Sequence, residues 1–244
     1  MATGFRIPEG RDHLLAMAQL AEQAERYDEM AVAMRRLART TSELSNDELQ
    51  LLLVAYKHIV TSRRASWRVA CSVEQAEERQ RSAQLPIARN LRKQIEAEIT
   101  EACQDLLSLL DRNLIPSAVS EESKVVLFRT QGDYFRYLAE VSMMDAERDQ
   151  AHEAYTKATE FAAALRPLSP LRLSLALNFA IFYYEVLRSP DKACQLARQA
   201  YEDAIAEDDD LEEEERKEAA VVLHLLRDNL FLWTERDEGP DGPE

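Results

Sequence analysis

The stretch SNDELQLLLVAYKHIVTSRRASWRV, residues 45–69, indicates the fold class of this chain. It begins with Ser45 and, three residues later, Glu48, the pattern of a capping box in which each side chain bonds the backbone N–H of the other residue. An apolar run follows at once, with neither glycine nor proline in it. The stretch therefore predicts the start of a long helix, which we expect to continue past Trp67 into the seventies.

The rest of the chain has the same helical character. Only five glycines and eight prolines occur among 244 residues, and Gly132 is the one glycine outside the terminal segments. Hairpins and phosphate-cradling loops depend on glycine, so the composition disfavours both. Apolar residues recur with helical spacing in nine segments joined by short connections. The sequence predicts an all-α fold of nine antiparallel helices.

We expect these helices to form one domain over residues 1–244. Its ordered core spans about 10–235, with short flexible tails at 1–9 and 236–244. The segment 171–187 is apolar on nearly all sides, so we expect it to form a buried helix at the centre of the fold.

The charge and cysteine content limit the location and the partners of the protein. It carries 45 Asp and Glu residues against 30 Lys and Arg residues, a net charge of −15. Such a surface repels the phosphate backbone, so we expect no binding to nucleic acid. No apolar run reaches the length of a membrane span, and the N-terminal residues lack the apolar core of a signal peptide. Three distant cysteines favour a reduced compartment. We expect a soluble protein of the cytoplasm, with the nucleus as a second location.

Motifs for catalysis or metal binding are missing from the sequence. The four histidines are isolated, and the HExxH, GxSxG and glycine-rich phosphate-loop patterns do not occur. The acidic run at 207–218 lacks the glycine and the alternating spacing of a calcium loop. We therefore predict no enzyme, no catalytic residue, no cofactor and no metal site. Two other classes stay open at this point: a helical-bundle enzyme, and a tetratricopeptide-like scaffold that binds peptides independently of phosphate.

A local block of cations is unusual for such an acidic chain. Residues 49–73 contain no carboxylate but four cations, Lys57, Arg63, Arg64 and Arg68. Lys57 and Arg64 lie seven residues apart, so both project from one helix face, and Arg129 and Arg136 repeat that spacing. Ordinary surface ion pairs are one interpretation. The other is a phosphate site, because planar guanidinium groups bind phosphate through two parallel hydrogen bonds.

Five long stretches carry a resemblance to a known family. They are LAEQAERYDEM (20–30), ELSNDELQLLLVAYKHIV (43–60), ESKVVLFRTQGDYFRYLAEV (122–141), LRLSLALNFAIFYYEVLRSPDKAC (171–194) and LLRDNLFLWT (225–234). In this order and spacing they resemble the 14-3-3 proteins over almost the whole chain. The resemblance implies a cup-shaped protomer with an amphipathic groove. It also implies a dimer that binds phosphoserine or phosphothreonine segments of client proteins.

The resemblance also implies roles for single residues. The phosphate-binding positions of the family are all present, as Lys57, Arg64, Arg136 and Tyr137. The groups that contact the client backbone and the polar side of the groove fall at Asn178, Asn229, Glu185 and Trp233. The apolar wall of the groove falls at Leu177, Ile181, Val222, Leu225 and Leu232. At the rim of the groove, Arg129 replaces a lysine of the family.

The two asparagines fit this assignment by their surroundings. Asn178 and Asn229 each lie in an otherwise apolar helix face, so we expect each amide to be buried and to need a hydrogen-bond partner. An extended peptide backbone offers both a donor and an acceptor. The alternative is an unusual packing residue of the core.

The resemblance implies that the first helix of one protomer packs on the third and fourth helices of its partner. The expected interface residues are Leu20, Ala24, Arg26, Ser66, Ala70, Val73, Leu91 and Glu98. Arg26 and Glu98 match an ion pair of the family, whereas Glu29 loses its partner because position 94 is Gln94. Rim ion pairs contribute only about 0–1 kcal/mol each, so burial of the apolar residues must decide the association. We expect a homodimer, and the same surface is suited to a heterodimer with another family member.

Overall fold

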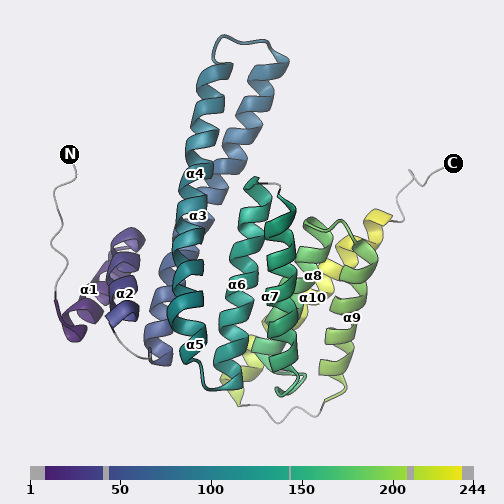
Figure 1. The fold of residues 1–244 in the computed structure, drawn as a ribbon. Helices are drawn as coiled ribbons and strands as arrows, with labels where there is room; N and C mark the ends of the chain where they lie inside the picture. Colours follow the sequence, from purple (N-terminus) through teal and green to yellow (C-terminus); the bar gives the residue numbers. More distant parts are fainter. Residues whose placement is uncertain (1–8, 41–43, 143, 208–211, 238–244) are drawn as a thin grey trace. The chain divides into compact units, whose positions relative to one another are not determined.

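The structure is a computed structural model that describes residues 9–40, 44–142, 144–207 and 212–237 (Figure 1). These ranges contain helices and no strand, which confirms the all-α prediction. The chain divides into two compact units, Met1–Ala118 and Val119–Glu244. Most of the two predicted tails, 1–8 and 238–244, lies outside the described residues.

The first unit contains four long helices and a short helical end. Their bounds are α1 (Arg11–Gln23), α2 (Tyr27–Thr40), α3 (Asn46–Arg79), α4 (Leu85–Leu109), the π-helical turn η1 (Leu110–Leu114) and α5 (Ile115–Ser117). With 34 residues, α3 is about 51 Å long. It packs along α4 on one side and against α2 on another, and α2 in turn contacts α1 (Figure 1).

The predicted capping box begins α3. The Glu48 backbone N–H donates to Ser45 Oγ at 3.3 Å, and the Ser45 N–H donates to Glu48 Oε2 at 2.8 Å. The Glu48 carboxylate also accepts hydrogen bonds from Arg11 Nη2, at 2.8 and 2.7 Å, although Glu48 is only 4% exposed. One buried carboxylate therefore both starts α3 and ties α1 to it.

The second unit contains the remaining long helices. Their bounds are α6 (Glu121–Ser142), α7 (Asp145–Ala162), α8 (Pro170–Glu185), α9 (Pro190–Ile205) and α10 (Glu213–Asp237). α8 contacts each of the other four, which confirms the central position predicted for the segment 171–187. The described residues thus hold nine helices of 13 residues or more, as predicted, and two short turns.

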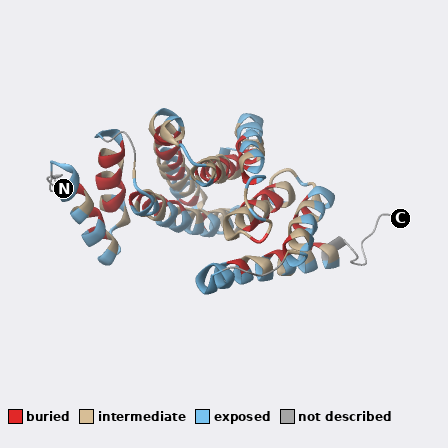
Figure 2. Cartoon of the chain, turned by 90° about the horizontal axis from the view of Figure 1, so that it is seen from below, coloured by how far each residue is buried: buried red, intermediate tan, exposed pale blue. Residues whose placement is uncertain are grey.

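Buried residues form stripes along the helices, with exposed residues on the opposite sides (Figure 2). In the second unit they make two clusters. An aromatic cluster between α7 and α8 includes Tyr155, Phe179 and Phe182. The other cluster, which we call the cluster beneath α10, joins α8 and α9 to the buried side of α10 and includes Leu226 and Trp233. In the described ranges, no helix combines the length and the apolarity needed to cross a membrane.

Gly132 lies in the middle of α6, and the packing of Tyr155 explains why. A Cβ atom at position 132 would lie 2.8 Å from Cδ1 of Tyr155 and 2.9 Å from its Cγ and Cε1 atoms. Contacts below 3 Å are not made by real Cβ atoms. The Tyr155 ring is fully buried and stacks on Phe179 at 5.2 Å between centroids. Glycine at 132 therefore allows α7 to place this ring directly on the α6 backbone.

We expect Gly132→Ala to destabilise the protein although alanine favours helices. The gain in helix propensity is about 1 kcal/mol, whereas overpacking a buried ring costs about 1–3 kcal/mol. The free energy of unfolding, measured with urea, should fall. Glu160→Ala, at an exposed position of α7, is the control and should change it little. A Gly132→Ala variant that is more stable than the wild type would contradict the close packing.

Candidate functional site

Arg136 lies on α6 in the interior of the second unit and is only 7% exposed. Its Nε donates to the Tyr155 hydroxyl at 3.2 Å. Two carboxylates lie farther from its Nη atoms, Asp133 at 3.5 Å and Glu140 at 3.9 Å. Burial lowers the pKa of Arg136, but Tyr155 and Asp133 outweigh this effect and hold it well above its ordinary value. The side chain is therefore a buried cation.

Asp133 connects Arg136 to two further helices. Its Oδ1 accepts a hydrogen bond from the Tyr155 hydroxyl of α7 at 2.5 Å. The Asn178 amide of α8 donates to Oδ1 at 3.1 Å and to Oδ2 at 3.0 Å. We call these four residues, Asp133, Arg136, Tyr155 and Asn178, the Asp133 cluster. All four belong to the second unit.

The sequence predicted Arg136 and Asn178 but missed Asp133 and Tyr155. Asp133 precedes Arg136 by one helical turn and directly follows Gly132, so its side chain was placed to reach the same face. Tyr155 carries no local signal of this kind. Only the packing of α7 on α6 brings its hydroxyl to Asp133.

The expectation that the Asn178 amide is buried is wrong, and its role as a contact for the client backbone stays a prediction. The residue is only half-buried, and Asp133 accepts from its Nδ2 within the same unit. The Asn178 Oδ1 atom accepts no hydrogen bond from the described part of the chain.

Tyr137 follows Arg136 on α6 and is half-buried. The guanidinium carbon of Arg136 lies 4.7 Å from the centroid of its ring, a cation–π contact. Tyr134 approaches the same ring edge-on, with 5.4 Å between centroids. These contacts restrict both predicted phosphate ligands of the second unit.

The cation block lies on α3 in the first unit. Lys57 and Arg68 are exposed, and Arg64 is half-buried. Arg63 forms ion pairs with Asp28 of α2 at 3.1 Å and with Glu98 of α4 at 3.5 Å. Carboxylates of other helices thus supply part of the negative charge that α3 lacks around its cations, as expected for ordinary surface ion pairs. The convergence of Lys57 and Arg64 with Arg136 and Tyr137 stays a prediction.

Arg129 lies two turns before Arg136 on α6. Its Nη1 donates to the Ser174 hydroxyl of α8. Its Nε is buried and has no hydrogen-bond partner in the described part of the chain. Arg129 is therefore held toward α8 by one contact, and its role at a groove rim stays a prediction.

The residues predicted for the apolar wall differ in exposure. Leu177 is buried, Ile181 and Val222 pack partly against the cluster beneath α10, and Leu225 and Leu232 are 43% and 54% exposed. On α10, exposed apolar side chains thus lie above a packed layer. This arrangement suits an apolar surface for a partner.

Three predicted polar contacts of the groove have distinct surroundings. Glu185 is exposed at the end of α8. Asn229 is half-buried rather than buried, and its Nδ2 already donates to the Leu225 carbonyl at 2.8 Å. Trp233 is only 5% exposed and stacks on Tyr184 at 4.8 Å between centroids. The burial expected for Asn229 is therefore wrong, and little of the Trp233 surface is available to a client.

The first unit exposes several of the predicted interface residues. Leu20 is 66% exposed, Val73 45% and Leu91 53%, while Ala24 and Ser66 are exposed as well. The sequence missed two further exposed apolar side chains close to them, Val69 and Ile87.

Ala70 and the interface ion pair require separate comment. Ala70 is 5% exposed, because it lies between Trp67 and Glu74 on the side of α3 that bonds to α4. It offers little surface of its own to a partner, and its assignment to the interface stays a prediction. Arg26 pairs with Glu29 of its own chain, and Glu98 pairs with Arg63.

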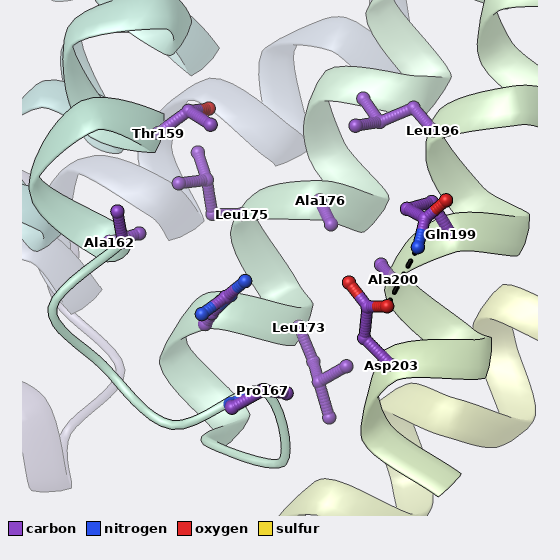
Figure 3. A pocket seen from close by; sticks show the side chains of 12 residues that line it. Thr159, Ala162, Pro167, Leu173, Leu175, Ala176, Leu196, Gln199, Ala200 and Asp203 are labelled. Carbon is purple, nitrogen blue, oxygen red and sulfur yellow. Dashed lines mark hydrogen bonds between the residues drawn. The ribbon is translucent and has the colours of Figure 1, made fainter. Parts of the chain in front are cut away.

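A cavity of about 190 Å³ lies apart from these residues, among α7, α8 and α9 (Figure 3). Its walls are mainly apolar, and Leu173, Ala176 and Leu196 are among them. Gln199 donates to Asp203 at 2.7 Å at its edge. The described residues that line it include none of the predicted site residues. No three His, Cys, Asp or Glu side chains in the described ranges are grouped to hold a metal ion.

We expect the protein to lose stability at alkaline pH. Burial, with Asp133, raises the pKa of Tyr155 well above its ordinary value, and burial, with Asp105, raises the pKa of Tyr56 in the first unit. An unfolded tyrosine ionises near pH 10. Above about that pH the unfolded state binds fewer protons than the folded one, so the free energy of unfolding falls as pH rises.

Urea midpoints should therefore be steady below about pH 9 and decline above about pH 10. Absorbance of ionised tyrosine at each pH provides the check. If all eight tyrosines ionised reversibly near pH 10 in the folded protein, the burial of both hydroxyls would be contradicted.

Comparison with known proteins gives consistent matches. A family model described as 14-3-3 protein matches residues 17–234. The chain is 50% identical to 14-3-3 protein zeta of Bombyx mori over 238 residues, 96% of each protein. It is 48% identical to human 14-3-3 protein beta/alpha, over 95% of this chain and 96% of that protein. It is also 48% identical to 14-3-3-like protein 2 of Caenorhabditis elegans, over 93% of each.

Proposed function

Because the chain belongs to the 14-3-3 family, we propose that it is an adaptor for client segments that contain phosphoserine or phosphothreonine. Family membership supports an adaptor role in general and sets aside the helical-bundle enzyme and the tetratricopeptide fold. The dependence of binding on the phosphate is part of the proposal. By holding such a segment, the protein clamps, masks or scaffolds its client in the cytoplasm and the nucleus.

The state of Arg136 is the observation that carries this proposal. A buried cation is stable only with an anionic partner, yet its two carboxylate neighbours are 3.5 and 3.9 Å from its Nη atoms. Nε donates to Tyr155, whereas Nη2 donates only a long hydrogen bond to Asp133 and Nη1 has only a distant ion pair with Glu140, so both Nη groups can form shorter bonds to a ligand. A phosphate suits them because its several oxygens accept charge-assisted hydrogen bonds. Tyr137, held beneath the guanidinium, supplies a hydroxyl to the same phosphate.

Lys57 and Arg64 of α3 complete the phosphate site in this proposal. Their seven-residue spacing places both on one face of the helix. The surrounding chain carries a net charge of −15, so at long range it repels acidic segments in general. Close-range contacts with a doubly charged phosphate then have to provide the selectivity.

The client backbone lies along α8 and α10 in this proposal. Asn178, Asn229 and Glu185 contact its polar groups. Leu225 and Leu232 are exposed and receive its apolar side chains, over a support of Leu177, Ile181 and Val222. Trp233 acts chiefly through its packing on Tyr184, and Arg129 adds positive charge at the rim.

Family membership implies dimerisation, and we assign it to the exposed apolar residues of the first unit. Leu20 and Ala24 of one protomer pack against Val73 and Leu91 of its partner. Two linked grooves raise the avidity for a doubly phosphorylated client by about 10²–10⁴. Ser66, exposed between basic residues, is placed so that a phosphate on it would add negative charge to this seam.

We expect Arg64→Ala to weaken binding of a phosphoserine peptide about tenfold or more, because each charge-assisted hydrogen bond contributes about 1.5–3 kcal/mol. Fluorescence anisotropy with the peptide and its unphosphorylated twin measures this. Arg79→Ala, in the last turn of the same helix, removes the same charge and should have little effect. Equal affinity of the wild type for the two peptides would overturn the proposed function.

We expect Leu91→Glu to shift the protein toward the 27.9 kDa monomer in sedimentation equilibrium, because a carboxylate would be buried in the apolar seam. Ile205→Glu changes an apolar residue of similar exposure in the second unit and should leave the dimer intact. A dimer equally stable in both variants would place the interface elsewhere.

A further inference from the structure

Asp133 connects two side chains of the second unit that bind the client in the proposed function, Arg136 for the phosphate and Asn178 for the backbone. Its carboxylate lies within hydrogen-bond distance of Tyr155 on α7 and Asn178 on α8. Arg136, one turn away on α6, is held through Tyr155. Neither the sequence nor the family matches assign a role to Asp133.

The directions of these hydrogen bonds are fixed by their chemistry. A carboxylate only accepts hydrogen bonds, and a guanidinium only donates them. The raised pKa of Tyr155 keeps its hydroxyl protonated, so Arg136 donates to Tyr155 and Tyr155 donates to Asp133. Asn178 donates to Asp133 from the opposite side. The Asp133 carboxylate thus accepts from Tyr155 and Asn178 directly, and over a longer distance from Nη2 of Arg136.

The orientation of the Asn178 amide follows from this arrangement. Its Nδ2 lies 3.1 and 3.0 Å from the two carboxylate oxygens. Turning the amide over would place Oδ1 against them, oxygen against oxygen, and leave both acceptors without a donor. Oδ1 therefore points away from Asp133. It accepts no hydrogen bond from the described residues.

We propose that Asp133 is a positioning residue which makes Asn178 an acceptor for one client backbone N–H and so disfavours proline at that client position. This inference rests on the proposed function, since it names the group of the client backbone that Asn178 recognises. An amide free to rotate could accept from an N–H or donate to a carbonyl, and would tolerate any residue. In an amide held by Asp133, the side that faces away from the carboxylate carries Oδ1, which can only accept. A proline at the client position opposite Oδ1 has no N–H to donate to it.

The same carboxylate fixes the distance between the phosphate-binding group and the acceptor for the client backbone. Through Tyr155 it holds the Nε of Arg136, and directly it holds Asn178. The phosphate-binding Nη groups and the accepting Oδ1 are therefore fixed relative to each other within one unit. The requirement for an N–H falls at a single distance in sequence from the phosphorylated residue.

The experiment scans one peptide with N-methyl groups. The peptide is the tightest binder from a phosphoserine library, and each residue near the phosphoserine is N-methylated in turn. We expect the full-length wild type to lose affinity about threefold to tenfold at one position that Asn178 contacts, the effect of one hydrogen bond. Asn178→Ala should bind the unmodified peptide more weakly and should be indifferent to methylation at that position.

Asp133→Asn is the decisive variant, because an amide at 133 can face either end of the Asn178 amide. We expect the methylation penalty to shrink at that one position and to persist elsewhere. Glu140→Gln neutralises the other carboxylate near Arg136 and should keep the wild-type pattern. A general loss of packing in Asp133→Asn would not change discrimination at one position alone.

A second measurement covers the case that Asp133→Asn does not fold. In wild-type protein, the NMR signals of the Asn178 side-chain NH₂ should be protected from exchange without peptide and should change little on binding. Fast exchange in the free protein would overturn the role of Asp133. A wild-type methylation pattern in Asp133→Asn would do the same, with the proposed function intact. Binding that ignores the phosphate would overturn the proposed function itself.

Discussion

The hydrogen bond from the Tyr155 hydroxyl to Asp133 organises the second unit. It forms only because Gly132 lets the Tyr155 ring lie against the α6 backbone. Through it the guanidinium of Arg136 is oriented by its Nε, while Asp133 and Glu140 compensate its buried charge only through long contacts with the Nη atoms. The packing of α7 on α6 and the orientation of the buried Arg136 side chain thus depend on the placement of the Tyr155 ring.

The first unit handles its charges differently. Asp105 accepts from Tyr56 and pairs with Arg35 at 2.7 Å, and Glu74 pairs with both Arg89 and Arg92. Arg63 of the cation block has its counter-charges on neighbouring helices. An acidic protein thereby neutralises some of its cations within helix contacts. The exposed Lys57 extends toward solvent from the same helix.

The exposed apolar residues of the first unit explain how a dimer can persist with few interface ion pairs. Arg26 meets Glu29 in its own chain, and Glu98 meets Arg63. Surface ion pairs contribute about 0–1 kcal/mol, whereas full burial of a leucine or valine contributes about 1.5–3 kcal/mol. Leu20, Val73 and Leu91 therefore dominate the association in this proposal.

The sequence by itself determined the helices, because their signals are local. The Ser45–Glu48 capping box, the helical spacing of apolar residues and the scarcity of glycine act within one or two turns. Family resemblance also located Arg136 and Asn178. Tertiary structure alone decided the partners of these residues. Asp133 meets Asn178 across 45 positions of the chain and Tyr155 across 22, and Ala70 is buried by α4. Such contacts depend on which helix faces meet, a property of packing that no local pattern encodes.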